Sequence, residues 1–144
     1  VLFRSPDRVV LEAQAGMPGD AWSRKTRENT DSQLAVIQHD VAQLIARGQP
    51  LGLFGDNLFL ELDLSRDNLP AGSRLRAGQA ILEVTPLPHD GCRKLRARFG
   101  DAALQFVSDP ARRHLNLRGI YLCVVQAGEV AVGDPVRVLR RGPG

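Results

Sequence analysis

The chain has 144 residues, of which 43% are hydrophobic and 24% charged, and it carries a formal net charge of +3 at pH 7. These values are typical of a globular domain, and no apolar run reaches the ~18 residues that a membrane-spanning helix needs, which excludes a membrane protein. Only one Trp, one Tyr and five Phe are present, too few to stack on several bases, so we do not expect a nucleic acid as the partner.

One hydrophobic core is expected for a chain of this length, and therefore one domain over residues 1–144. The first five residues contain neither an initiator methionine nor a signal pattern, which indicates that the N-terminus of the domain is truncated. The two cysteines, Cys92 and Cys123, show neither CxxC nor metal-ligand spacing. We therefore expect no disulfide framework and a cytoplasmic location.

The N-terminal half predicts short elements separated by turns rich in Gly and Pro. The apolar run at 9–11 is too short for periodicity to decide between a helical turn started by the preceding proline and a short strand, and we favour the helix. In a helix at 40–47, Val41, Leu44 and Ile45 share the face that we expect to be buried. The expected elements, in chain order, are a helix at 5–14, a strand at 32–38, a helix at 40–47 and strands at 58–64 and 74–76.

The C-terminal half predicts more strands and no long helix. The strand at 79–85 alternates clearly and leads into a proline-containing turn at 86–91. The nearly continuous apolar run at 120–126 predicts a strand that is buried together with Cys123, and two tight turns after it indicate a β-meander. The expected elements are a strand at 79–85, short helices from Cys92, at 101–107 and from Pro110, and strands at 120–126, 129–132 and 135–140.

The turn at 86–91 places Cys92 at the start of a helix that is rich in cations. Helix N-terminal amides and positive charge both favour the thiolate, which is the nucleophilic and metal-binding form of cysteine. Residues 89–118 contain seven Lys or Arg and three acids, a net charge of +4 in a chain whose total is +3. The sequence therefore indicates a small anionic ligand beside a reactive Cys92, the alternative being an inert, buried cysteine.

Two more residues are candidates for the site. His89 lies three residues before Cys92, so the two could form a Cys–His nucleophile pair, although a loop histidine that faces water or a carboxylate is the more common case. Asn57 lies in a turn, either as a turn residue or as a hydrogen-bond partner of a ligand. The motifs GxxxxGK[ST], GxGxxG, HExxH and GxSxG are absent, which removes support for the common nucleotide-binding, zinc-protease and serine-hydrolase functions.

Several short segments occur in the order of a known family. They are residues 16–22 (GMPGDAW), 53–58 (LFGDNL), 69–75 (LPAGSRL), 78–85 (GQAILEVT), the Cys92 segment with 98–100 (RFG), 118–121 (RGIY) and 128–134. Together, over about residues 16–138, they resemble the MOSC domain, the C-terminal domain of molybdenum cofactor sulfurases, which also occurs as a small stand-alone bacterial protein. The resemblance implies a mainly β, MOSC-like β-barrel with a few short helices.

The resemblance also implies a function. Cys92 would carry sulfur as a persulfide to the molybdenum cofactor (molybdopterin), or would ligate molybdenum directly, in sulfur transfer or as part of a molybdenum-dependent reductase. The cofactor is a pterin with a phosphate group and a dithiolene-bound metal. We expect Arg93, Lys94 and Arg98 to hold this anion, Asn57 and Arg118 to line its pocket, and a redox or sulfur-donor protein to be a partner.

Two further expectations accompany this assignment. Pyridoxal phosphate is associated with the wider family, but it belongs to a separate domain of the sulfurases and is not expected on this chain. The alternative function is a non-catalytic module that binds a phosphorylated ligand or partner through the same cations, with an inert Cys92.

Overall fold

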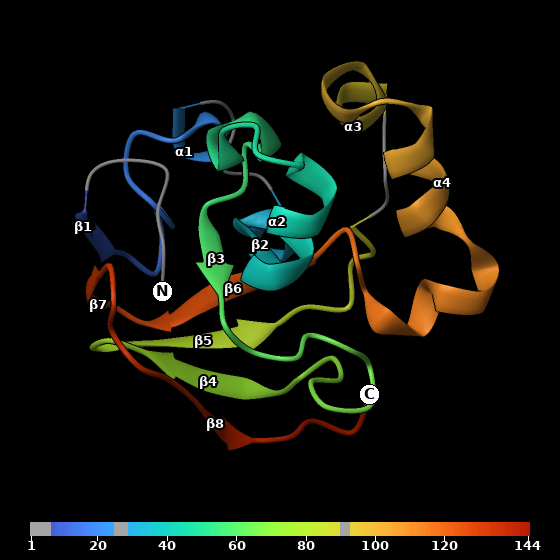
Figure 1. The fold of residues 1–144 in the computed structure, drawn as a ribbon. Helices are drawn as coiled ribbons and strands as arrows, with labels where there is room; N and C mark the ends of the chain where they lie inside the picture. Colours follow the sequence, from blue (N-terminus) through green and yellow to red (C-terminus); the bar gives the residue numbers. More distant parts are fainter. Residues whose placement is uncertain (1–6, 25–28, 90–92) are drawn as a thin grey trace.

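The structure of the chain is a computed structural model, in which residues 7–24, 29–89 and 93–144 are described. Figure 1 shows short helices around a strongly curved sheet. In chain order the elements, with 3-10 helices labelled η, are β1 (Arg8–Leu11), α1 (Ala21–Arg24), η1 (Thr30–Ser32), β2 (Leu34–Gln38), α2 (His39–Ala46), η2 (Leu51–Phe54), β3 (Leu58–Leu60), β4 (Arg74–Ala77), β5 (Ala80–Val84), α3 (Arg93–Phe99), α4 (Asp101–Ser108), η3 (Pro110–Leu115), β6 (Ile120–Gln126), β7 (Gly128–Ala131) and β8 (Val136–Arg140).

Six strands form a curled, mixed sheet in the order β3-β2-β6-β5-β4-β8, while β1 and β7 form a separate two-stranded sheet. Strands β2 and β3 are parallel, and the other neighbouring pairs are antiparallel. The curled sheet makes a half-barrel, so the predicted mainly β, barrel-like fold with a few short helices is confirmed. No helix in the described part of the chain is long and apolar enough to cross a membrane.

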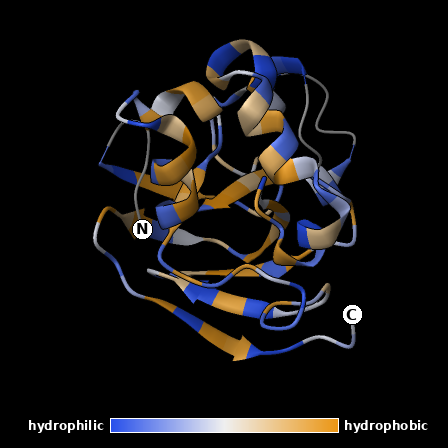
Figure 2. Ribbon diagram, turned by 45° about the vertical axis from the view of Figure 1, so that its right-hand side comes forward, coloured by the Kyte–Doolittle hydropathy of each residue, from blue (hydrophilic) through white to orange (hydrophobic). Residues whose placement is uncertain are grey.

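Two hydrophobic cores lie on opposite faces of β2 and β3. Successive residues of a strand point to opposite faces, so Leu58 and Leu60 enter the core inside the curled sheet, whereas Phe59 enters a second core. Ile37 of β2 joins Phe59 there, with residues of α2, α3 and α4. Each helix carries both hydrophobic and hydrophilic stretches (Figure 2), as expected for helices that cover a sheet with one face. The second core therefore attaches the helices to the sheet.

Most of the predicted elements are confirmed, but the predicted helix at 5–14 is wrong. Residues 8–11 form strand β1, in which each residue pairs with one of β7, from Arg8 opposite Ala131 to Leu11 opposite Gly128. Leu11 is fully buried in the core inside the curled sheet. The partner strand lies more than a hundred residues away, so no local pattern could indicate this pairing.

The predicted β-meander of the last three strands is also wrong. After β6 the chain leaves the six-stranded sheet, and β7 pairs with β1 instead. β8 returns to that sheet and pairs with β4 at its edge. The start of β7 passes close to the turn between β4 and β5, since a Cβ atom on Gly128 would lie 2.4 Å from the carbonyl carbon of Gln79. The glycines correctly predicted the turns between these strands. They do not determine which partner each strand pairs with.

Three predicted details are corrected. Strand β3 ends at Leu60 instead of continuing to residue 64. Leu44 is 65% exposed, because α2 turns Ala42 and Ile45 toward the second core instead. Cys123 is only partly buried, because β6 alternates and places this residue on the face opposite to its buried neighbours. The sequence of this strand is nearly all apolar, so it does not indicate which of its residues face the core.

Candidate functional site

A pocket of about 830 Å³ lies where the end of β5, the start of β6, the loop at 85–89 and η3 come together. We call it the β5–β6 pocket. Much of its wall is apolar, and its cationic or titratable lining residues are Arg66, His89, Arg113 and Arg118. Arg66 and Arg113 are exposed, whereas Arg118 is buried. A pocket of this size with few polar groups on an apolar wall is typical of a site for a small molecule or a cofactor.

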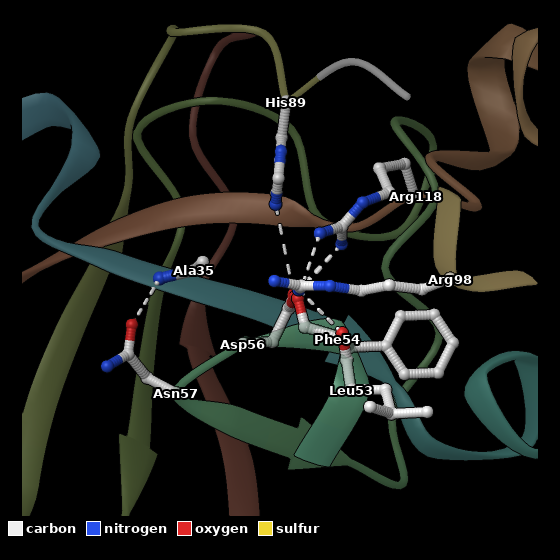
Figure 3. A network of polar contacts seen from close by, with 8 residues as sticks. All are labelled: Ala35, Leu53, Phe54, Asp56, Asn57, His89, Arg98 and Arg118. Atoms are coloured by element: carbon white, nitrogen blue, oxygen red, sulfur yellow. Dashed lines mark hydrogen bonds and ion pairs between the residues drawn. The ribbon is translucent and has the colours of Figure 1, made fainter. Parts of the chain in front are cut away.

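A buried ion pair lies behind this pocket. The side chain of Asp56 is 0% exposed and that of Arg118 9%. Nη1 of Arg118 donates to both carboxylate oxygens of Asp56, at 3.0 and 3.2 Å, and Nη2 donates to the carbonyl oxygen of Phe54 at 3.5 Å (Figure 3). The Nε atom of Arg118 is buried and has no hydrogen-bond partner among the described residues. The Nε–H is therefore a buried donor of this guanidinium group that no described residue satisfies.

His89 joins the same pair from the loop that follows β5. Its ring stacks on Tyr121 of β6, with the ring centroids 4.3 Å apart and the planes 18° apart. Its Nε2 atom points at Asp56 and lies 3.8 Å from Oδ2 (Figure 3). That distance suits an ion pair but exceeds a hydrogen bond, and no described residue hydrogen-bonds this buried nitrogen. The structure thus brings together Asp56, His89 and Arg118, which are far apart in the sequence.

The three cations predicted on α3 lie elsewhere. Arg93 and Lys94 are exposed, and neither they nor Arg98 are among the residues that line the β5–β6 pocket. Nη1 of Arg98 donates to the carbonyl oxygen of Leu53 at 2.7 Å, so this side chain extends toward the turn that carries Asp56 (Figure 3). Contact between these cations and a ligand stays a prediction.

The amide of Asn57 serves the fold. Its Oδ1 atom accepts a hydrogen bond from the backbone N–H of Ala35 at 2.8 Å. Its Nδ2 atom donates to Oδ2 of Asp20 at 2.7 Å and to the sulfur of Met17 at 3.5 Å. These contacts hold the loop before α1 against β2. The predicted role of Asn57 in ligand binding is not tested by them and stays a prediction.

Cys92 lies outside the described residues, as do Asp90 and Gly91. Its predicted roles as nucleophile, sulfur carrier and metal ligand therefore stay predictions. The structure does describe the chain up to His89 and again from Arg93, the first residue of α3. In the part of the chain that it describes, no group of three or more His, Cys, Asp or Glu residues could hold a metal ion.

Sequence reasoning missed Asp56, although it considered Asn57 beside it. The available signal was the combination of an acid in an apolar turn, LFGDNL, with an arginine expected at a pocket, because a buried charge is usually paired with an opposite one. It also missed Tyr121, because stacking between β6 and the loop after β5 depends on the pairing of these strands. Arg66 belongs to a segment that was treated only as turns.

Comparison with known proteins shows which family and which folds this chain is similar to. The family model of the MOSC domain matches residues 20–137. YiiM from Geobacillus stearothermophilus is similar over 95% of this chain and 63% of its own, with a TM-score of 0.63 and 24% identity. YiiM from Escherichia coli is similar over 94% of this chain and 63% of its own, with a TM-score of 0.62 and 22% identity.

A shorter relative extends the comparison. The YUAD protein from Bacillus subtilis is similar over 92% of this chain and 85% of its own, with a TM-score of 0.62 and 20% identity. At these identities the likeness is one of fold. The chain spans 63% of the length of the two YiiM structures, and no curated protein sequence matches it significantly.

Proposed function

Because this chain belongs to the MOSC domain family, which is associated with molybdenum cofactor binding, we propose that its β5–β6 pocket binds the molybdenum cofactor. The observation that carries the proposal is the lining of this pocket. Two nitrogen-bearing side chains that are at most 10% exposed, His89 and Arg118, lie beside an apolar wall at the end of the loop that leads to Cys92. A flat pterin with an anionic substituent suits such a surface.

The residues of the pocket fit this cofactor in two respects. The buried Nε–H of Arg118 has no partner in the described part of the chain, so it can donate to an anionic oxygen without breaking the ion pair with Asp56. Arg66 and Arg113 are exposed at the same pocket, where they would attract a phosphate group. We propose that Arg118 orients the cofactor and that the two exposed arginines hold its anionic end.

We propose Cys92 as the residue that acts on the sulfur or the metal. The described residues offer no cluster of three metal ligands, so the metal would be held by the dithiolene of the cofactor together with the Cys92 thiolate, a soft ligand. When bound, the cofactor would supply a molybdenum centre that exchanges a sulfur or oxygen ligand. Cys92 would ligate that centre, or carry a persulfide sulfur supplied by a sulfur-donor protein.

Both roles of Cys92 lead to a function in sulfur transfer or as part of a molybdenum-dependent reductase. The histidine at the pocket, His89, would hold or release a proton beside the bound ligand. A redox or sulfur-donor protein would then be a partner. The alternative is a non-catalytic module for a phosphorylated ligand, which Arg66, Arg113 and Arg118 would also suit.

Co-purification tests the proposal. The chain is produced in a host that makes the cofactor, and molybdenum and pterin are quantified for the wild type, Cys92→Ser and the matched control Cys123→Ser. We expect both in the wild type and in the control. Loss of molybdenum from Cys92→Ser alone identifies a metal ligand. Retained molybdenum with loss of cyanide-labile sulfur identifies a persulfide carrier.

The same experiment separates the alternative. If none of the three proteins carries molybdenum or pterin, although the wild type binds inorganic phosphate, the proposal fails and the non-catalytic module is favoured.

A further inference from the structure

We propose that Asp56 is a positioning residue that acts through His89. Its carboxylate keeps a proton on Nε2 of the imidazole, so that Nδ1 is the nitrogen with the free lone pair. His89 lines the β5–β6 pocket, whereas Asp56 is fully buried and is not among the described lining residues. The inference deepens the proposed function, since it gives His89 a defined proton-accepting atom at the pocket of the cofactor.

The first step concerns the charge of Asp56. Its side chain is 0% exposed, and Nη1 of Arg118 contacts both of its oxygens, at 3.0 and 3.2 Å. Taking a carboxylate out of water is costly unless a paired and hydrogen-bonded cation compensates it. The guanidinium group of Arg118 is always charged, so the ion pair keeps Asp56 in its carboxylate form. Asp56 therefore presents an acceptor to whatever faces it.

The second step concerns the nitrogen that faces this acceptor. A neutral imidazole has one N–H group and one nitrogen with a lone pair. With the lone pair on Nε2, two electron-rich atoms would face each other at 3.8 Å in a water-poor environment, which is repulsive. With the proton on Nε2 the contact is attractive, and a shortening of about 0.6 Å would make it a hydrogen bond. The imidazolium form also carries that proton.

The third step concerns the orientation of the ring. Stacking on Tyr121, with 4.3 Å between centroids and 18° between planes, fixes the plane of the imidazole. The side chain of His89 is 10% exposed, so little space remains in which the ring could tilt. The edge that carries Nε2 is thereby held toward Asp56 (Figure 3). A carboxylate that sets the tautomer of a histidine also decides which of its nitrogens can accept a proton from a ligand.

The test is the tautomer of His89 in the 144-residue chain without cofactor. Two-bond ¹H–¹⁵N correlation spectra at pH 8.5, with resonances assigned by His89→Gln, report which ring nitrogen carries the proton. We expect the Nε2–H tautomer in the wild type. In Asp56→Asn the amide can still accept from Arg118, and its N–H₂ group would then donate to Nε2, so the proton should move to Nδ1.

The same spectra contain an internal reference. His114 is exposed, so it should show a mixture of tautomers that Asp56→Asn does not change. A merely structural role of Asp56 would alter stability without exchanging the protonated nitrogen. Asp56→Glu, which keeps the charge, should preserve the Nε2–H tautomer and serves as the second variant if Asp56→Asn does not fold.

The inference is overturned if wild-type His89 shows the Nδ1–H tautomer or the same mixture as His114. It is also overturned if Asp56→Asn folds and leaves the proton on Nε2. Neither result depends on molybdenum, so failure of this inference and failure of cofactor binding are distinguished. A chain that retains molybdenum with a mixed tautomer overturns only the role of Asp56.

Discussion

At the scale of single residues, the buried contact between Asp56 and Arg118 has a large energetic consequence. Both side chains are almost completely buried, and the second partner compensates the desolvation of the first. Removal of one partner of such a pair costs about 3–5 kcal/mol because the other charge stays buried without compensation. The pair therefore supports the back of the β5–β6 pocket as well as the position of His89.

We expect Arg118→Met to lower the free energy of unfolding by about 3–5 kcal/mol, measured by urea denaturation. The double variant Asp56→Asn/Arg118→Met should regain part of this loss, because no lone charge remains buried. The matched control is Arg112→Met, which breaks the half-exposed pair with Asp109 and should cost at most about 1 kcal/mol. Equal losses for the two arginines would show that the Asp56 pair is accessible to water.

The thiol of Cys123 provides a second prediction at this scale. Burial, followed by the nearby carboxylates of Glu83 and Asp31, raises its pKa above the ordinary value of 9.0. In a Cys92→Ser background, alkylation by iodoacetamide should therefore be slow at pH 7 and should still be increasing above pH 9. Glu83→Gln should lower the pH at which the rate reaches half its maximum, whereas the distant Glu129→Gln should not.

The sign of the effect on folding follows from the same shift. Because the pKa is higher in the folded chain, the contribution of Cys123 to stability is fully present below pH 9 and is lost as the pH rises through the folded pKa. A rate at pH 7 that is typical of a free, exposed thiol would contradict the burial of Cys123.

At the scale of elements, the junction before β6 decides how the sheet closes. Gly119 has a φ of +115°, and a Cβ atom on it would lie 2.2 Å from the carbonyl oxygen of Val36 in β2. This close approach lets β6 pair with β2 directly after Arg118 enters its ion pair with Asp56. Gly119 therefore affects both the pairing of β6 with β2 and the position of Arg118 beside it.

We expect Gly119→Ala to lower the free energy of unfolding by about 3 kcal/mol, because backbone strain and overpacking each contribute on the order of 1–3 kcal/mol. The matched control is Gly48→Ala, since Gly48 also has a positive φ, +87°, but a Cβ atom added to it would meet no described atom within 4 Å. It should cost about 1 kcal/mol. Thermal or urea denaturation of both variants decides whether the contact with β2 matters.

At the scale of the whole molecule, the cations of the chain serve separate purposes. Arg118 is buried in an ion pair, Arg98 binds the turn before Asp56, and Arg93 and Lys94 are exposed on α3. Only some of the positive charge counted along residues 89–118 therefore lies at the β5–β6 pocket. The charge that can attract an anion to this pocket includes Arg66, which the count did not contain.

We expect the double variant Arg66→Glu/Arg113→Glu to bind the pterin released from co-purified wild-type protein at least about tenfold more weakly at low ionic strength, measured by pterin fluorescence. The matched control, Arg93→Glu/Lys94→Glu, makes the same change of net charge away from the described pocket lining and should have a much smaller effect. Added salt should reduce the difference. A larger loss in the control would favour the α3 cations as the anion site.

The sequence alone determined the features that depend on neighbouring residues. The strands at β2, β4, β5 and β6, the helices α2 and α4, and the short helix that starts at Pro110 were predicted, because periodicity, turns and helix-start signals act within a few residues. The ordered short motifs also indicated the MOSC domain, which the family match confirms.

Only the tertiary structure decided the features that join distant segments. The pairing of β1 with β7, the place of β8 beside β4 and the meeting of Asp56, His89 and Arg118 behind one pocket all follow from how the sheet curls and closes. Hydrophobic burial and backbone pairing over the whole chain determine that closure. The local sequence of a strand, or of the segment that carries a buried charge, does not indicate which distant segment will be its partner.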